Sequence, residues 1–323
     1  MARSFRKIRQ KKIIDTGFGS NVSGRYLNKD GFPNVERKGI PIFSRFSWYH
    51  SLMYLSTWRF VFWMFSGFVS LNFIFAIIYY FIGVEHLTGI DKSTPFNEFI
   101  DVFFFSTQTF TTVGYGRVAP VGFLANVTST FEAFLGLLVF AIATGLFYGR
   151  FSRPRAFLKF SENILVSPYQ EVTSLMFRMA PYKNNALTDG HVIVTSAIET
   201  IEDGVLQSNF YNLKVELDRI NTLTLNWTVV HKIDQDSPFF GFTKEDFTSN
   251  DTNIEIMVQV RAFDDVFANT VVQKTSYINS EIVYGAKFVK MYEPSSDNLS
   301  TVLDLSKINE YQIVELPKIT VEN

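Results

Sequence analysis

The chain contains the stretch Thr112-Val113-Gly114-Tyr115-Gly116, which lies between two long apolar segments of a 323-residue sequence. Gly114 and Gly116 have no side chain, so their backbone reaches dihedral angles that other residues avoid. Dihedral angles that alternate along these residues would turn successive carbonyl oxygens toward one axis and leave Val113 and Tyr115 to pack outward. The stretch therefore predicts an irregular backbone between the two apolar segments.

The two apolar segments are long enough to cross a membrane as helices. No charged side chain occurs from Phe60 to Val84, and the segment from Phe123 to Gly149 contains only Glu132. A helix of about 25 residues extends roughly 37 Å, which exceeds the hydrocarbon thickness of a bilayer. The alternative, a pair of buried helices in a soluble protein, rarely stays uncharged over such a length.

The residues just before the glycine-containing stretch predict a short helix over 95–110. Thr94 is a favourable N-cap, Pro95 suits the first helical position, and Glu98 lies in the first turn. The apolar part is too short to cross a bilayer and suits a re-entrant helix that returns through 112–116. An irregular backbone at membrane depth is tolerated only where it lines a path through the protein.

Charge is distributed unevenly along the chain. Residues 1–159 carry 18 Lys and Arg against 8 Asp and Glu, whereas residues 160–323 carry 12 against 23. Twelve cations lie in 1–59 and four in 150–159, but only two lie in 60–117. Because cations concentrate on the cytoplasmic side of membrane proteins, we expect a multi-pass protein of the cell (inner) membrane with both termini in the cytoplasm.

The C-terminal half predicts β-structure. Apolar and polar residues alternate around 191–198, 212–218, 223–230, 254–263, 269–278 and 281–291. Short strands at such spacing, without long helical patterns, are typical of a β-sandwich.

Several functions are excluded or disfavoured by what the sequence lacks. It contains no cysteine, and its four histidines are scattered, so no metal-ligand spacing appears. No acid–base or nucleophile cluster accompanies the predicted sandwich, so we expect that the protein is not an enzyme. We also expect that it binds no cofactor and no nucleic acid. A two-span receptor with an extracellular sandwich is a further alternative, but the distribution of cations places the sandwich inside.

Residues Thr112 to Gly116 match the selectivity filter of potassium channels. Other stretches resemble the inward-rectifier potassium channel family, its bacterial branch in particular: Phe147-Tyr-Gly-Arg-Phe-Ser-Arg-Pro154, Leu175-Met-Phe-Arg178, Asn226-Trp-Thr-Val-Val-His-Lys-Ile-Asp-Gln-Asp-Ser-Pro238 and Ser276-Tyr-Ile-Asn-Ser-Glu-Ile-Val-Tyr-Gly285. The resemblance covers about residues 40–292. It implies a homotetrameric potassium channel in which the carbonyls of Thr112, Val113, Gly114, Tyr115 and Gly116 bind K⁺.

The expected fold is a membrane α-helical two-span pore domain with a re-entrant pore helix, followed by an all-β immunoglobulin-like cytoplasmic sandwich. We predict a cytoplasmic tail (1–42), an interfacial slide helix (43–57), a pore domain (58–151, with spans 58–84 and 123–151, pore helix 95–110 and filter 112–116), a linker (152–160) and the sandwich (161–323). For 43–57 the alternative is an aromatic-rich extension of the first span.

The second span carries the candidate gate. Phe140, Thr144 and Tyr148 share a helix face, and in a tetramer their rings would close the pore by dewetting; the alternative is contact with lipid. Gly136 matches the hinge glycine of the family, or is a small residue needed for close helix packing. Glu132 either adds negative field below the filter or forms a hydrogen bond behind it.

The resemblance also assigns residues outside the pore. Lipid-binding positions, which contact phosphoinositides in the family, are Trp58, Arg59, Arg150, Arg153, Arg155 and Lys183. Cations near a membrane attract anionic headgroups at about 1 kcal/mol each. Acidic positions expected to line a cytoplasmic vestibule and concentrate cations are Asp189, Asp264 and Asp265. The stretch 263–270 aligns with an apical loop of that domain, a second gate.

Three residues depart from the pattern of the family. Gln108 stands where a glutamate usually braces the filter, and Arg117 stands where an aspartate usually attracts cations to the outer mouth. Either change leaves a non-selective cation channel as an alternative. Phe140 replaces the acid that holds Mg²⁺ or polyamines in strong rectifiers, so we expect weak block and weak intrinsic rectification.

Overall fold

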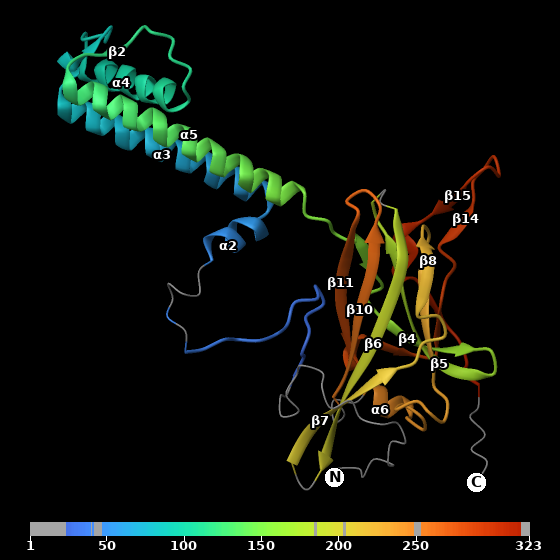
Figure 1. Cartoon of the computed structure of the whole chain (residues 1–323). Helices are drawn as coiled ribbons and strands as arrows, with labels where there is room; N and C mark the ends of the chain where they lie inside the picture. The colour runs from blue at the N-terminus through green and yellow to red at the C-terminus, as the bar shows by residue number, and fades with distance from the viewer. Residues whose placement is uncertain are drawn as a thin grey trace. The chain divides into compact units, whose positions relative to one another are not determined.

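The computed structural model describes residues 24–39, 41, 47–183, 186–202, 205–248 and 253–317. The chain divides into two compact units (Figure 1). One unit is Lys38–Arg153, and the other joins the described residues up to Arg37 to those from Pro154 onward. Each unit is described by itself.

The first unit is helical. It consists of α2 (Trp48–Tyr54), α3 (Thr57–Ile82), α4 (Pro95–Phe110) and α5 (Phe123–Phe151), with a short helix η1 (Val84–His86) and the paired strands β1 (Leu87–Thr88) and β2 (Ala119–Pro120). Helices α3 and α5 are both long and apolar enough to cross a membrane. They lie side by side, and α4 packs against both (Figure 1). The unit is therefore a two-span membrane domain with a short third helix.

Local sequence fixes both ends of α4. The Thr94 hydroxyl accepts a hydrogen bond from the Asn97 amide at 3.2 Å, and Pro95 occupies the first position, where no amide proton is needed. At the other end, the Thr111 amide donates to the Thr107 carbonyl before the chain leaves the helix. The filter stretch thus begins directly at the C-terminal end of α4.

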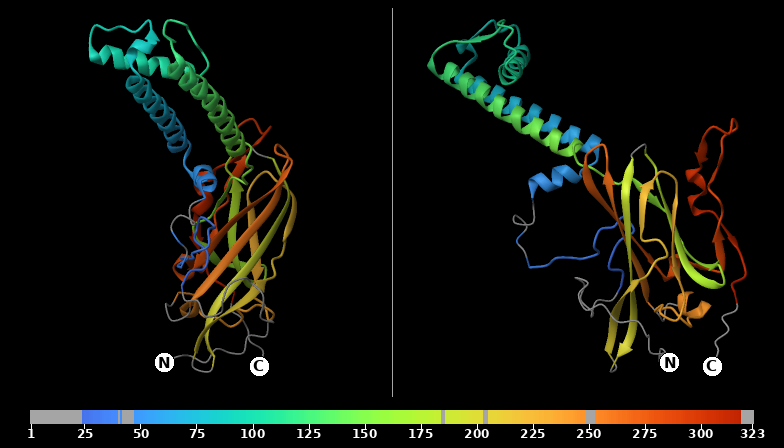
Figure 2. Two further views of the ribbon diagram at one scale, coloured as in Figure 1. Left: turned by 60° about the vertical axis from the view of Figure 1, so that its left-hand side comes forward. Right: turned by 45° about the vertical axis from the view of Figure 1, so that its right-hand side comes forward.

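The second unit is a β-sandwich (Figure 2). One sheet has the order β11 (Asn269–Ile278), β10 (Ile254–Asp264), β6 (Leu187–Glu202) and β7 (Val205–Leu213), with β8 (Arg219–Leu223) also paired to β6. The other has the order β12 (Ile282–Tyr284), β4 (Ile164–Tyr169), β5 (Val172–Pro181) and β3 (Leu158–Phe160), with β9 (Trp227–Lys232) paired to β5. Two small two-stranded sheets pair β13 (Ala286–Phe288) with β16 (Tyr311–Ile313) and β14 (Tyr292–Pro294) with β15 (Thr301–Leu303). The short helices of this unit are α6 (Lys244–Thr248), η2 (Asn279–Glu281) and η3 (Leu305–Asn309).

The core of the sandwich lies between the two sheets. Alternate residues of β10, from Ile254 to Val260, are at most 1 % exposed and pack in one cluster with Phe177 of β5 and Val194 of β6. Burying this apolar surface supplies most of the stability of the domain. The predicted all-β sandwich is confirmed.

Three strand predictions differ from the observed strands, and one of them, 281–291, covers the two short strands β12 and β13. The stretch 212–218 is largely outside strands, because β7 ends at Leu213. The stretch 223–230 covers the end of β8 and the start of β9 rather than one strand. Strands β4 and β5 were not predicted, since β5 is buried along nearly its whole length and shows no alternation.

The outer face of β5 is covered by the C-terminal part of the chain. Arg178 of β5 is 2 % exposed, and its guanidinium donates to the carbonyls of Ile308 at 2.7 Å and Val289 at 2.6 Å. Burial lowers the pKa of Arg178 to about 10. A charged side chain thus lies inside the domain, bound by backbone carbonyls of a distant segment.

The remaining boundaries also differ from those predicted. Helix α2 lies within the segment expected to form a slide helix, and residues 43–46 of that segment lie outside the described part of the chain. Its placement in the membrane interface stays a prediction. The expected linker includes β3, which begins at Leu158. The described part of the expected N-terminal tail, up to Arg37, belongs to the β-sandwich unit.

Candidate functional site

The backbone of the filter stretch alternates in conformation. The φ angles of Thr112, Gly114 and Gly116 are 59°, 55° and 80°, whereas Val113 and Tyr115 between them do not have positive φ. The amides of Val113 and Gly114 both donate to the Gln108 carbonyl, at 2.9 and 3.3 Å. The stretch is therefore tied to the end of α4 while its dihedral angles reverse at every second residue.

Thr112 was not expected to adopt a left-handed conformation, because sequence reasoning assigned that role to the glycines alone. A β-branched residue at positive φ is strained, and such strain persists only where the surrounding structure imposes it. Strained residues of this kind cluster at functional sites. Thr112 thus belongs to the same alternating backbone as Gly114 and Gly116.

Gly136 lies where α5 approaches the end of α4 most closely. A Cβ atom at this position would lie 2.0 Å from the Phe110 carbonyl oxygen, so only glycine fits. Helix α5 continues without interruption from Phe123 to Phe151. These observations support close packing, the alternative to a hinge at Gly136.

Glu132 lies one turn before Gly136 and is fully buried. Its carboxylate accepts hydrogen bonds from the hydroxyls of Ser106 at 2.5 Å and Tyr79 at 2.7 Å. Of the two interpretations left open by the sequence, the geometry supports a hydrogen bond behind the filter. Gln108, which stands where the family has a bracing glutamate, contributes its backbone carbonyl to the filter amides.

The positive charge at the end of the filter is paired. The Arg117 guanidinium lies 2.7 Å from Asp101 of α4, although the side chain is 66 % exposed. Asp101 also accepts a hydrogen bond from the Asp91 amide at 2.9 Å. The weaker attraction of cations expected from Arg117 is thus offset by a carboxylate, that of Asp101, which the sequence did not identify.

The predicted gate residues form an uncovered face of α5 in the single chain. Phe140 is 73 % exposed and Tyr148 is 74 % exposed, and Thr144 between them is also exposed. The Thr144 hydroxyl donates to the Phe140 carbonyl of its own helix at 2.9 Å, so its hydrogen bond is made within α5. This face is available to neighbouring copies or to lipid.

Two of the predicted lipid-binding cations are already engaged by α2. Arg150 donates to the carbonyls of Leu52, Met53 and Leu55, at 3.2, 3.3 and 2.5 Å. Arg153 donates to the Tyr54 hydroxyl at 2.9 Å and lies over its ring. The guanidinium of Arg150 therefore binds carbonyls at the C-terminal end of α2, and the assignment of Arg150 to a lipid site stays a prediction.

The other predicted lipid positions are more accessible. Trp58 is 85 % exposed, and Arg59 beside it is exposed in the first turn of α3. In the β-sandwich unit, Arg155 is exposed and the Lys183 ammonium lies 4.1 Å from the centre of the Phe157 ring.

The predicted vestibule acids differ in their environments. Asp264 is 1 % exposed and accepts from the amides of Val266 and Phe267, so it stabilises the turn between β10 and β11 rather than lining a water-filled space. Asp189 pairs with Arg219 at 2.9 Å. Asp265 is exposed and accepts from the Thr188 hydroxyl.

A cavity beside Asp189 is lined by both acidic and basic side chains. It has a volume of about 660 Å³, and its lining includes Asp189, His191, Asp218, Arg219 and Arg261. An excess of acid, as expected from the sequence, is therefore not found in this part of a single chain.

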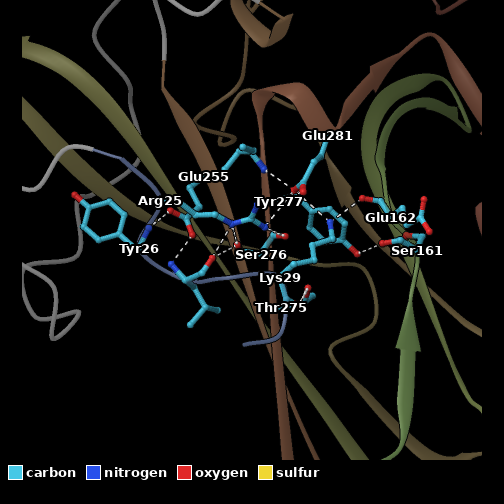
Figure 3. Close-up of polar contacts among 12 residues, drawn as sticks. Arg25, Tyr26, Lys29, Ser161, Glu162, Glu255, Thr275, Ser276, Tyr277 and Glu281 are labelled. Atoms are coloured by element: carbon cyan, nitrogen blue, oxygen red, sulfur yellow. Dashed lines mark hydrogen bonds and ion pairs between the residues drawn. The ribbon is translucent and has the colours of Figure 1, made fainter. Parts of the chain in front are cut away.

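An N-terminal strap, residues 25–34, was missed by sequence reasoning and packs on the sandwich (Figure 3). The amides of Tyr26 and Leu27 donate to the Glu255 carboxylate at 2.5 and 2.9 Å. Glu255 is 5 % exposed, and burial raises the pKa of this carboxyl group although the two amides oppose the shift. Apolar contacts with Phe210 and Met257 accompany these bonds.

The strap is also held by two cations (Figure 3). Arg25 lies 3.2 Å from Glu281 and donates to the Ser276 carbonyl at 2.9 Å. The Lys29 ammonium lies 3.2 Å from Glu281 and 3.9 Å from the centre of the Tyr277 ring. Arg25 and Lys29 are two of the ten Lys and Arg in residues 1–42, so the sequence carried no signal that singled them out.

Strand β11 contacts both the strap and the segment that follows α5 in the chain. The side-chain amide of Gln273 accepts from the Leu158 amide at 2.9 Å and donates to the Leu158 carbonyl at 2.6 Å. The Tyr277 hydroxyl donates to the Ser161 carbonyl at 3.0 Å. One strand thus binds the two chain segments that continue into the membrane unit.

Two membrane helices, a re-entrant helix and an alternating filter backbone define an ion channel of the two-span class, here joined to a β-sandwich. A family model described as "Ion channel" matches residues 60–153, and one described as "Inward rectifier potassium channel C-terminal domain" matches residues 158–323. The chain belongs to the inward rectifier potassium channel family.

Similar proteins come from bacteria and animals. The chain is 33 % identical over 291 residues to the inward rectifier potassium channel Kirbac3.1 of Paramagnetospirillum magnetotacticum. The aligned region covers 88 % of this chain and 95 % of that protein. It is 26 % identical over 258 residues to the ATP-sensitive inward rectifier potassium channel 12 of Gallus gallus, covering 72 % and 58 %. It is 30 % identical over 206 residues to the inward rectifier potassium channel 4 of Homo sapiens, covering 59 % and 45 %. The chain thus spans about half the length of these animal relatives.

The family resolves several alternatives raised by the sequence. Its members are ion channels, so an enzyme is excluded and so is a receptor with a ligand-binding sandwich. The predicted relation to the bacterial branch is confirmed by the match to Kirbac3.1. Tetrameric assembly is typical of the family.

Proposed function

We propose that four copies of this chain form a K⁺-selective channel in the cell membrane, with both termini in the cytoplasm. The observation that carries this proposal is the alternation of φ through Thr112, Gly114 and Gly116 at the end of α4. Four such stretches around one axis place rings of carbonyl oxygens where they replace the hydration shell of K⁺. The C-terminal end of α4 adds the negative pole of a helix dipole, which favours a cation.

The proposed gate is the face of α5 that carries Phe140, Thr144 and Tyr148. In a tetramer these exposed side chains meet around the axis, and two aromatic rings per chain make a constriction that excludes water. The cytoplasmic domain provides a second gate at the turn between β10 and β11. Because β11 binds both the strap and the segment after α5, a movement of this hairpin acts on both connections to the membrane unit.

Anionic lipids with phosphoinositide-like headgroups are the proposed modulators. Trp58 and Arg59 lie exposed at the start of α3, and Arg155 is exposed at the start of the sandwich unit. Each cation near an anionic surface contributes about 1 kcal/mol to attraction. Arg153 and Lys183 remain candidates, since each still presents a cation beside an aromatic ring.

Rubidium uptake into liposomes that contain the purified protein tests the function. Uptake blocked by barium and unaffected by competing sodium supports a K⁺ channel, whereas equal competition by sodium indicates a non-selective cation channel. Added phosphoinositide should change the rate, and replacement of Arg59 and Arg155 by alanine should weaken that change. No uptake at any lipid composition would contradict the proposal.

A further inference from the structure

Four buried polar side chains join the three long helices of the membrane unit behind the filter. Asn72 and Tyr79 belong to α3, Ser106 to α4 and Glu132 to α5, and none is more than 1 % exposed. We refer to these four residues as the interhelix cluster.

The carboxylate of Glu132 is the centre of the cluster. One of its oxygens accepts from the Tyr79 hydroxyl at 2.7 Å, and the other accepts from the Ser106 hydroxyl at 2.5 Å. The Ser106 oxygen also lies 3.1 and 3.3 Å from the backbone and side-chain oxygens of Asn72. Because the two donors come from different helices, a single carboxylate fixes α3 and α4 at set positions relative to α5.

The cluster is connected to the filter through α4. Ser106 lies half a turn before Gln108, whose carbonyl accepts the amides of Val113 and Gly114. One turn further along both helices, Gly136 of α5 lies against the Phe110 carbonyl. Two successive turns of α5 therefore contact two successive turns of α4. Because the filter amides bond to the end of α4, a displacement of α4 would displace them as well.

Holding the three helices together does not by itself explain why the residues of the interhelix cluster are polar. A buried carboxylate loses its hydration, and apolar residues of similar volume usually stabilise a buried site at least as well. A polar network whose members are all satisfied holds its partners in one arrangement, which apolar packing does less strictly. K⁺ and Na⁺ are distinguished by the arrangement of the filter carbonyls, so the depth and tilt of α4 affect that distinction.

We propose that Tyr79 and Ser106 are positioning residues for ion selectivity, which act through Glu132 on α4 and so on the filter. This inference rests on the K⁺ conduction proposed above. The cluster takes over the bracing that the glutamate at the position of Gln108 provides elsewhere in the family.

The test compares single-atom changes inside the cluster with matched changes outside it. Tyr79→Phe and Ser106→Ala each remove one hydroxyl from Glu132. Tyr80→Phe changes the next residue of α3, which is 43 % exposed, and Ser129→Ala removes a hydroxyl that donates only to the backbone of its own helix. The full-length tetramers are reconstituted in bilayers, and the ratio of sodium to potassium permeability is measured from reversal potentials.

We expect both cluster variants to raise this ratio about tenfold, the change that corresponds to about 1.4 kcal/mol in ion preference. The two control variants should keep the wild-type ratio. A second readout is the concentration of K⁺ or Na⁺ that protects the tetramer against heat, which should rise for K⁺ in the cluster variants alone.

Two results would overturn the inference. Tyr79→Phe and Ser106→Ala channels with the wild-type permeability ratio would show that the cluster does not act on ion choice. Failure of both variants to form tetramers would assign the cluster to assembly instead. A wild-type channel that is not K⁺-selective would instead overturn the proposed function, so the two failures are distinguishable.

Discussion

At the scale of single residues, Gly136 illustrates how a close approach between helices selects glycine. Gly136→Ala would place a Cβ atom 2.0 Å from the Phe110 carbonyl oxygen, and overpacking of this kind costs about 1–3 kcal/mol or more. We expect a lower melting temperature for the tetramer in detergent, measured by thermal unfolding.

The control for this change is Gly67→Ala on α3, where a Cβ atom meets no heavy atom within 4 Å. Replacement of an unconstrained helical glycine stabilises a helix by about 0.5–1 kcal/mol. Equal melting temperatures for the two variants would contradict the packing interpretation and favour the interpretation of Gly136 as a hinge.

His231 is the residue for which the sandwich domain predicts a pH effect. Its Nδ1 lies 2.7 Å from the Lys214 carbonyl and therefore donates, so Nε2 accepts from the Ser237 hydroxyl at 2.8 Å. Burial lowers the pKa of His231 below its usual 6.5. Below about pH 6.5 the unfolded chain gains a proton that the folded chain does not, and stability falls as pH falls.

We expect the free energy of unfolding to decrease by up to about 1.4 kcal/mol per pH unit between pH 6.5 and the lowered pKa. The measurement is the melting temperature of the protein from pH 7.5 to 5.5. In a His231→Gln variant, which cannot titrate, this part of the slope should disappear. A slope unchanged by the substitution would show that other groups cause it.

At the scale of helices and strands, Arg150 connects the C-terminal end of α5 to the C-terminal end of α2. The last carbonyls of a helix have no partner within it, and Arg150 binds those of Leu52, Met53 and Leu55. Hydrogen bonds to a charged group contribute about 1.5–3 kcal/mol to stability, so we expect α2 to unfold locally more often in Arg150→Ala.

Hydrogen exchange of residues 48–56, followed by mass spectrometry, measures this opening. We expect exchange at least about tenfold faster in Arg150→Ala, as a loss of 1.4 kcal/mol would produce. The exposed Arg155 provides the control, since Arg155→Ala should leave the exchange of α2 unchanged. Unchanged exchange in Arg150→Ala would show that these hydrogen bonds do not hold α2 in its helical state.

Prediction of these elements from sequence depended on whether a local signal existed. The cap at Thr94 and Pro95 is a local signal, and it located the start of α4 correctly. Strand β5 has no alternation because both of its faces are covered, so its pattern could not distinguish it from other buried segments. The partners of Glu132 were equally hidden, since Tyr79 and Ser106 lie 53 and 26 residues away from it.

At the scale of the whole molecule, we expect Phe140 to determine whether four chains together hold a blocking cation. Without an acid at this position, internal spermine or Mg²⁺ should block only weakly. Phe140→Asp places four carboxylates around the axis, and we expect strong voltage-dependent block by internal spermine. Current–voltage relations in bilayers measure it.

Phe140→Asn is the matched control, because it has the size and polarity of the aspartate variant but no charge. Its block should remain as weak as that of the wild type. Strong block of the wild-type channel by spermine would contradict the prediction, and so would equal block of the two variants.

The bonds between Tyr26 and Glu255 join residues that are 229 positions apart in the chain. At translation rates of 5–20 residues per second, roughly 10–50 s pass between the synthesis of one partner and the other. During that time both hydrophobic helices leave the ribosome, while the strap has no surface on which to dock. A nascent chain that stalls before residue 255 therefore never closes this contact, and a docked strap distinguishes chains synthesised past Glu255 from shorter ones.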